Sequence, residues 1–243
     1  NTMIKAIVFD VDDTLYDPRP SFERAFKQVF ANEITDDLMD HFYCNYLQQE
    51  QLVEAKSSQE NDLKLSKQEI TFHCLHHSFK EFALNGLTQQ KAQQFSRQYT
   101  ELTRNIKLFD GLTTVFNKLT EKFTLGIITN GATDIQLAKI MRLKLHHWFG
   151  RERIITSEDA DTRKPDPMIF TLMNRKLELH GNEMVYVGSS YLTDIVPAKK
   201  AGWQTVWYNN HNGTIADPSI IPDQTGNNSA QLQELLLELA AEA

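Results

Sequence analysis

Cysteine is scarce in this sequence: Cys44 and Cys74 are the only two among 243 residues. Two cysteines are too few for the disulfide framework of a small secreted protein and are typical of reduced thiols in the cytoplasm. We therefore expect a cytoplasmic protein in which both thiols are free.

Long apolar runs and basic clusters are also missing. No run approaches the roughly 20 apolar residues that span a bilayer, so no membrane partner is expected. The 25 Lys and Arg residues are outnumbered by 32 Asp and Glu, which gives a formal net charge of −7. Because nucleic-acid affinity comes largely from clustered Lys and Arg, this composition argues against a nucleic-acid partner. It indicates no particular oligomeric state.

What the sequence does contain is a regular alternation of strand-like and helix-like segments. Residues 4–9 are mostly apolar and stop abruptly at the acidic cluster 10–13, as in a buried parallel strand. Beyond residue 102, short apolar runs alternate with helical stripes, which predicts an α/β fold: a Rossmann-like parallel sheet with helices on both faces. The predicted strands there are 124–128, 153–156, 184–187 and 205–208, and the predicted helices are 112–119, 135–143, 168–177 and 194–201. The polar stretch 209–229 predicts a loop, and a leucine stripe after it predicts a final helix.

A second, all-helical region interrupts this alternation. Its apolar side chains recur at helical spacing, and it shows no strand-like pattern. Ser66 with Glu69 has the spacing of a capping box, and Thr88 stands at an expected helix N-cap. The predicted domains are an α/β core (residues 1–17 and 103–243) and a helical insert (residues 18–102).

Polar side chains follow four of the predicted strands. Because parallel strands bring their carboxyl ends to one edge of a sheet, where ligands bind, we expect these side chains to converge. They are Asp10 and Asp12 after the first strand, Thr129 and Asn130 after the second, Lys164 near the third, and Ser189, Ser190 and Asp194 after the fourth.

Each of these residue types has a use in phosphoryl transfer, where positioning and charge neutralisation dominate the barrier. Asp10 can attack phosphorus to form an aspartyl-phosphate. Asp12, expected on the same side of an extended strand as Asp10, can act as general acid and base. Thr129 and Lys164 can bind the phosphoryl oxygens. Closely packed carboxylates need a hard cation, which predicts Mg²⁺ with Asp10 and Asp194 as ligands.

The sequence resembles the haloacid dehalogenase superfamily in four motifs that occur in order along the chain. The motifs are residues 9–15 (FDVDDTL), 127–131 (IITNG), 163–167 (RKPDP) and 187–194 (VGSSYLTD). The resemblance implies that Asp10 is the nucleophile and Asp194 a metal ligand. It also implies that Asp12 is the acid–base group, with its backbone carbonyl as a further ligand of Mg²⁺. The phosphate-binding groups that it implies are Thr129, Asn130 and Lys164.

The resemblance extends to the insert and to the substrate. A helical insert after the first motif is similar to the family's cap, which closes over the site and selects substrates. Residues 128–131 followed by Gln136 resemble the bacterial pyrimidine nucleotidases. Among small phosphorylated metabolites, this resemblance places nucleoside monophosphates ahead of sugar phosphates.

Ser189 departs from the family pattern, because the fourth motif usually has an acid at this position. We keep Ser189 as a metal-site residue and expect weaker Mg²⁺ binding, since a neutral hydroxyl attracts a hard dication less than a carboxylate does. Two alternatives stay open. One is a metal-independent 2-haloacid dehalogenase, which the serine favours and Asp12 opposes, because a halide leaving group needs no proton. The other is a catalytically weakened phosphate-binding regulatory domain.

Overall fold

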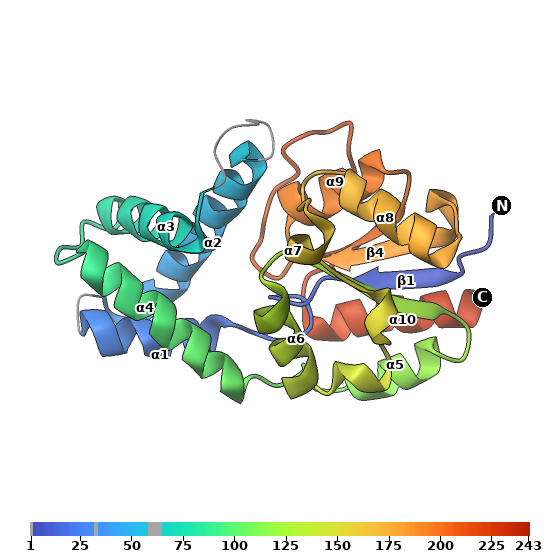
Figure 1. Cartoon of the computed structure of the whole chain (residues 1–243), viewed down its shortest axis with the longest axis horizontal. Coiled ribbons are helices and arrows are strands. Elements are labelled where there is room, and N and C mark those ends of the chain that lie inside the picture. The colour runs from blue at the N-terminus through green and yellow to red at the C-terminus, as the bar shows by residue number, and fades with distance from the viewer. Residues whose placement is uncertain (1, 32–33, 58–64) are drawn as a thin grey trace. The chain divides into compact units, whose positions relative to one another are not determined.

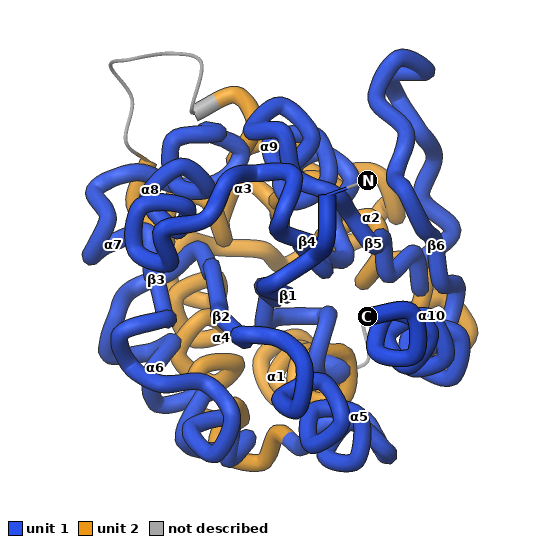
Figure 2. The backbone as a smooth tube through the Cα atoms, turned by 90° about the vertical axis from the view of Figure 1, so that its right-hand side faces the viewer, with its two compact units in different colours: residues 1–17, 107–243 blue, residues 18–106 orange. Residues whose placement is uncertain are grey.

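The computed structural model describes residues 2–31, 34–57 and 65–243 (Figure 1). It consists of two compact units, which Figure 2 distinguishes by colour. Residues 1–17 and 107–243 form the first, called the core unit below, and residues 18–106 form the second, called the helical unit.

The core unit is built on a six-stranded parallel sheet with the order β3-β2-β1-β4-β5-β6. The strands are β1 (Ala6–Phe9), β2 (Thr124–Thr129), β3 (Ile154–Thr156), β4 (Met184–Gly188), β5 (Gln204–Tyr208) and β6 (Gln224–Gly226). The chain builds the sheet outward from β1 in one direction and then, from β4, in the other. The strand order therefore reverses between β1 and β4, and in open parallel sheets ligands bind outside the carboxyl ends of the strands at this point. The predicted α/β fold class is confirmed.

Helices cover both faces of this sheet, as Figure 1 shows. They are α5 (Leu112–Leu119), α6 (Thr133–Arg142), α7 (Ser157–Ala160), α8 (Met168–Leu177), α9 (Val196–Lys200) and α10 (Ser229–Glu242). Successive side chains of a strand point to opposite faces. Val8 accordingly belongs to the core cluster beneath α8, whereas Phe9 packs edge-on against Phe116 of α5, with ring centroids 5.5 Å apart. All four residues of β1 are buried, which explains its nearly unbroken apolar sequence.

The helical unit has an aromatic core of its own. Its helices are α1 (Arg19–Phe30), α2 (Asp36–Ser57), α3 (Lys67–Glu81) and α4 (Gln89–Leu102). The predicted capping box is confirmed, because the Ser66 hydroxyl accepts from the Glu69 N–H at 3.1 Å and the Glu69 carboxylate accepts from the Ser66 N–H at 2.7 Å. The Thr88 hydroxyl likewise accepts from the Lys91 N–H at 3.1 Å. A turn of 3-10 helix (Thr103–Asn105) follows α4, and the unit ends at residue 106.

The structure departs from the sequence prediction at the edge of the sheet. The stretch 209–229, predicted as a loop, contains β6, which pairs with β5 in parallel. Three residues, two of them exposed, provide no apolar pattern from which a strand could be predicted. Neither Cys44 nor Cys74, both among the described residues, forms a disulfide. Within the described residues, no helix is both long and apolar enough to cross a membrane.

Candidate active site

Asp10 lies at the carboxyl end of β1, where the strand order reverses. Its N–H donates to the Val187 carbonyl of β4 at 2.9 Å, which ties the residue to the neighbouring strand. The side chain is buried. One carboxylate oxygen is 3.0 Å from Nζ of Lys164, and the other accepts from the Thr14 hydroxyl at 3.4 Å. The fold thus presents one carboxylate, next to a cation, at the predicted ligand-binding edge.

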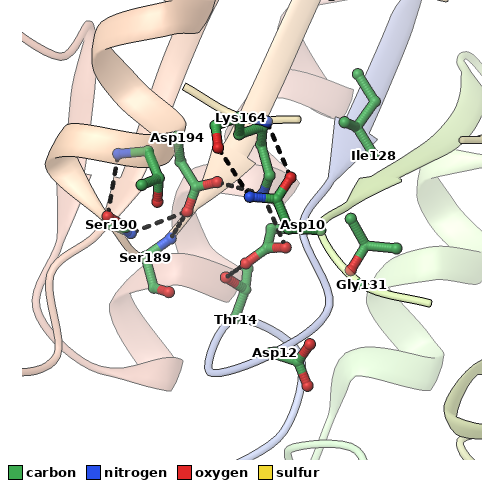
Figure 3. A network of polar contacts seen from close by, with 12 residues as sticks. Asp10, Asp12, Thr14, Ile128, Gly131, Lys164, Ser189, Ser190 and Asp194 are labelled. Carbon is green, nitrogen blue, oxygen red and sulfur yellow. Dashed lines mark hydrogen bonds and ion pairs between the residues drawn. The ribbon is translucent and has the colours of Figure 1, made fainter. Parts of the chain in front are cut away.

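Lys164 is the centre of this network (Figure 3). Its buried Nζ lies 3.0 Å from Asp10 Oδ1, 2.5 Å from Asp194 Oδ1 and 3.0 Å from the Tyr186 hydroxyl. That hydroxyl donates its own proton to the Ile128 carbonyl at 2.8 Å, so its oxygen is left to accept from Lys164. An ammonium has three N–H donors, and here each of them has an acceptor.

Asn130 holds the backbone of Lys164 in place. Its amide nitrogen donates to the Lys164 carbonyl and its amide oxygen accepts from the Lys164 N–H, both at 2.9 Å. The end of β2 therefore positions the lysine that meets the end of β1. Phosphate binding by Asn130 stays a prediction, because the structure shows its side chain bound to the Lys164 backbone.

Asp194 comes from a π-helical turn (Tyr191–Ile195) that follows β4. Its Oδ2 accepts from the N–H groups of Ser189 and Ser190 at 3.1 and 2.9 Å, which aims Oδ1 at Lys164. A Cβ at Gly188 would lie 2.5 Å from the Cβ of Asp194, so only glycine fits at that position. The predicted helix 194–201 thus starts inside the π-helical turn, and its α-helical part, α9, begins at Val196.

Ser189 joins the site through its backbone. Its N–H donates to Asp194, and its carbonyl accepts from Nε1 of Trp207 at 3.0 Å. These two bonds fix the peptide on either side of the serine. The structure thus places Ser189 beside Asp194, while its role as a metal-site residue stays a prediction.

Asp12 is held apart from the lysine network. Strand β1 ends at Phe9, so the argument that Asp12 shares one face of an extended strand with Asp10 is wrong. Figure 3 shows Asp12 pointing away from Asp10 and Lys164. Its Oδ1 is 2.8 Å from Nζ of Lys139 and also accepts from the Tyr16 hydroxyl. Its Oδ2 accepts from Nε2 of Gln136 at 3.0 Å.

Thr129, the last residue of β2, connects to Asp12 through the same glutamine. Nε2 of Gln136 donates to Thr129 Oγ1 at 2.5 Å as well as to Asp12. Both Thr129 and Gln136 are buried. The site therefore has two parts, one around Lys164 and the other around Gln136.

The two aspartates of the first motif have opposite electrostatic environments. Burial, opposed by the charge of Lys164 and aided by the charges of Asp194 and Asp12, raises the pKa of Asp10 to about 8. Burial also acts to raise the pKa of Asp12, but the charge of Lys139 and hydrogen bonds from Lys139, Tyr16 and Gln136 outweigh it and lower the pKa to about 2. A carboxylate nucleophile must be ionised. One ammonium shared by two buried carboxylates is therefore too little positive charge for Asp10, and a further cation would lower its pKa.

Mg²⁺ fits this deficit of charge. Among the described residues, no group of three or more His, Cys, Asp and Glu side chains could hold a metal ion. Mg²⁺ needs only one or two carboxylates, because it keeps water ligands and takes substrate oxygens. The two carboxylates predicted as its ligands, Asp10 and Asp194, meet at one atom, Nζ of Lys164, at 3.0 and 2.5 Å.

Several residues of the site were missed as site residues in the sequence, among them Tyr16, Lys139 and Tyr186. Tyr186 had a signal, because it is a hydroxyl-bearing residue in the otherwise apolar strand β4. Lys139 follows Gln136 by three residues on α6, so the two side chains share one helix face. Tyr16 carried no such signal.

Sequence comparison identifies similar proteins with named activities. A family model described as haloacid dehalogenase-like hydrolase matches residues 7–208. A glyceraldehyde 3-phosphate phosphatase of Pyrococcus abyssi is 28% identical over 210 residues, which cover 85% of this chain and 82% of the relative. The pyrimidine 5′-nucleotidase PynA of Streptococcus pneumoniae is 28% identical over 225 residues, which cover 88% of this chain and 89% of the relative.

Two solved structures illustrate the shared fold. The HAD-hydrolase YfnB of Bacillus subtilis, bound to magnesium, has a TM-score of 0.71 and 23% identity, covering 97% of this chain and 100% of its own. The L-2-haloacid dehalogenase RSc1362 has a TM-score of 0.74 and 18% identity, with the same coverage of 97% and 100%. At these identities the likeness shows the fold alone.

Proposed function

Because the chain belongs to the haloacid dehalogenase-like hydrolases, we propose that it hydrolyses phosphate monoesters of small metabolites through an aspartyl-phosphate at Asp10. The observation that carries the proposal is the buried pair of Asp10 and Asp194 on Lys164. Positive charge beside a nucleophilic carboxylate is what the attack on an anionic phosphate requires. The names of the phosphatase and nucleotidase relatives support the same chemistry.

The reaction has two steps. In the first, a carboxylate oxygen of Asp10 attacks phosphorus and the bond from phosphorus to the leaving oxygen breaks. Asp12, whose pKa the negative charge of the bound ester raises from its low value in the free protein, gives that oxygen a proton. In the second, water attacks phosphorus and loses a proton to Asp12. The bond from phosphorus to Asp10 then breaks, which releases phosphate and restores the carboxylate. Lys164 and the Thr129 hydroxyl bind the phosphoryl oxygens in both steps.

Asp10, Asp194 and the Asp12 carbonyl would hold Mg²⁺ in this site. When bound, Mg²⁺ supplies positive charge that offsets the carboxylates and the phosphoryl group. The neutral side chain of Ser189 leaves the site one negative charge short of the family pattern. We therefore propose weak Mg²⁺ binding.

Two substrate classes follow from the relatives. Pyrimidine nucleotidases support nucleoside monophosphates, and glyceraldehyde 3-phosphate phosphatases support phosphorylated trioses and sugars. The sequence around Thr129 and Gln136 places nucleoside monophosphates first. Ser189 favours a second candidate function, metal-independent dehalogenation, although a dehalogenase would have no use for a proton donor at Asp12.

A substrate panel tests the proposal. The protein is incubated with nucleoside monophosphates, sugar phosphates, 4-nitrophenyl phosphate and 2-chloropropionate, each with Mg²⁺ and with a chelator. We expect phosphate release that depends on Mg²⁺ and no chloride. Chloride release in chelator would favour the dehalogenase, and neither product would favour the regulatory domain.

Substitution of the nucleophile makes the test specific. Asp10→Asn keeps the size of the side chain but cannot attack phosphorus, so turnover should fall at least about a thousandfold while the protein stays folded. Asp17→Asn, an exposed change at the end of the same segment, is the matched control and should retain activity. Phosphate release and circular dichroism are measured for both. Near wild-type turnover in Asp10→Asn would exclude the aspartyl-phosphate.

A further inference from the structure

We propose that Gln136 and Lys139, on one face of α6, are positioning residues that orient Asp12 and Thr129 for phosphoryl transfer. The inference rests on the proposed function, because it concerns the acid–base group and a phosphate-binding group of that site. It goes further by assigning roles to two residues that have no part in the two reaction steps.

Gln136 serves two partners with one nitrogen. The two N–H bonds of a side-chain amide can go to two acceptors, and here Nε2 lies 2.5 Å from Thr129 Oγ1 and 3.0 Å from Asp12 Oδ2. Because the Thr129 oxygen accepts from Gln136, the hydroxyl proton must point elsewhere. Gln136 thereby presets Thr129 as a donor, which is what a phosphoryl oxygen needs. The glutamine is only 2% exposed, so water does not readily replace it.

Lys139 holds the other oxygen of the same carboxylate. Its Nζ is 2.8 Å from Asp12 Oδ1, and its side chain is 13% exposed against 37% for that of Asp12. Gln136 and Lys139 together bind both oxygens of Asp12, which fixes rotation of the carboxylate about its own bond. The hydroxyl of Tyr16 adds a third donor. A half-exposed carboxylate without these contacts would rotate freely in solvent.

The direction in which Asp12 is held suits an acid for the leaving group. In-line displacement puts the attacking and leaving oxygens on opposite sides of phosphorus. The residue that protonates the leaving oxygen must therefore stand apart from the nucleophile, and Figure 3 shows Asp12 pointing away from Asp10. Gln136 ties that acid to Thr129, so displacement of the α6 side chains would move the acid relative to the phosphoryl group.

The test uses two esters of similar shape, phenyl phosphate and 4-nitrophenyl phosphate. Phenolate is a poor leaving group that needs a proton, whereas 4-nitrophenolate leaves readily without one. Asp12→Asn should lower kcat/KM for phenyl phosphate about a hundredfold more than for 4-nitrophenyl phosphate. Lys139→Met should lower kcat/KM for phenyl phosphate about tenfold more than for 4-nitrophenyl phosphate. Lys139→Arg, which keeps the positive charge, should return most of the activity lost on phenyl phosphate. Gln136→Met should show the same selectivity plus a loss on both esters through Thr129.

Non-additivity is the second readout. Because Lys139 acts through Asp12, Lys139→Met added to Asp12→Asn should change nothing further on either ester. Equal losses on both esters in Lys139→Met, with Asp12→Asn selective, would overturn the inference and leave the proposed function standing. An unselective Asp12→Asn would remove the acid role and the inference with it. Thermal unfolding checks the fold of each variant, and Lys139→Gln replaces Lys139→Met if the latter does not fold.

Discussion

At the scale of the residue, Lys164 is the cation that neutralises two buried carboxylates in the core unit. It is 3% exposed and faces two carboxylates that are themselves buried, Asp10 and Asp194. Burial alone would lower the pKa of Lys164, but the two aspartates raise it well above its ordinary value. Removal of one partner from a buried charge network leaves the others uncompensated in a medium of low polarity.

Lys164→Met should therefore destabilise the protein by about 3–5 kcal/mol, measured by urea unfolding. Lys199 offers a matched control, since its Nζ also lies 3.0 Å from a carboxylate, that of Asp223, but at the surface. Lys199→Met should cost at most about 1 kcal/mol. Addition of Asp10→Asn to Lys164→Met removes one unpaired charge and should recover part of the loss. Equal losses in the free energy of unfolding for Lys164→Met and Lys199→Met would show that a buried ion pair contributes no more to stability here than an exposed one.

We expect the residue at position 189 to affect the Mg²⁺ concentration that activity requires. Ser189→Asp adds a carboxylate beside Asp194 on a backbone that is already held by Asp194 and Trp207. It should lower the Mg²⁺ concentration for half-maximal phosphate release by about tenfold, because hard dications prefer charged oxygens. Ser189→Asn introduces a neutral side chain of the same size as Asp, so its Mg²⁺ titration curve should stay near that of the wild type. Identical curves for all three proteins would show that position 189 does not face the metal.

At the scale of the element, the sequence was informative wherever burial imposed a pattern. The segments predicted as α5 and α8 agree with the structure at both ends, 112–119 and 168–177, because their apolar faces pack on the sheet. The edge strand β6 and the π-helical turn before α9 could not be predicted in the same way. The first exposes two of its three residues, and the second depends on hydrogen bonds between Asp194 and the peptides after β4.

The same distinction applies to the site. Strand ends predicted that Asp10, Lys164 and Asp194 would meet, and the structure brings these three side chains together. The orientation of Asp12 could not be read from strand periodicity, because it is set by Lys139 and other donors after the strand has ended. Side chains placed at strand ends by backbone topology were predictable, whereas the orientation of Asp12, which depends on the hydrogen bonds of its carboxylate beyond the strand end, was not.

Helix α3 offers a test of local stability in the helical unit. Ser66 forms both halves of a capping box with Glu69, so Ser66→Ala leaves the Glu69 N–H without its side-chain partner. The change should lower the free energy of unfolding by about 1 kcal/mol, measured by urea unfolding. Ser66→Asn, which can still accept from that N–H, should cost only a few tenths of a kcal/mol. Equal losses in the two variants would show that the cap does not contribute.

At the scale of the whole molecule, the order of the strands in the sheet brings the proposed catalytic side chains from distant parts of the chain to one place. The sheet grows from β1 to β3 and then from β4 to β6, so the two central strands, β1 and β4, are far apart in the sequence. Their carboxyl ends carry Asp10 and the turn with Asp194. The helical unit is inserted directly after the first of these ends and has a separate aromatic core.

The insertion point leads to a prediction about the independence of the core unit. The Phe109 N–H donates to the Leu15 carbonyl at 3.0 Å, so the chain leaves the core unit and re-enters it at neighbouring points. Replacement of residues 18–106 by a short glycine–serine linker should therefore leave the sheet intact, because the sheet and its helices keep their own buried core. Circular dichroism and cooperative thermal unfolding measure this.

The shortened protein also separates chemistry from selection. All the described side chains of the lysine network and of the Asp12 network belong to the core unit, so hydrolysis of 4-nitrophenyl phosphate should persist at a reduced rate. If the helical unit is the substrate-selecting cap, the shortened protein should lose most of the wild-type ranking among nucleoside monophosphates and sugar phosphates, because it no longer excludes water or contacts the leaving group. The same linker carrying Asp10→Asn is the control for residual catalysis and should release no phosphate. A folded, shortened protein that kept the full substrate ranking would show that selectivity resides in the core unit.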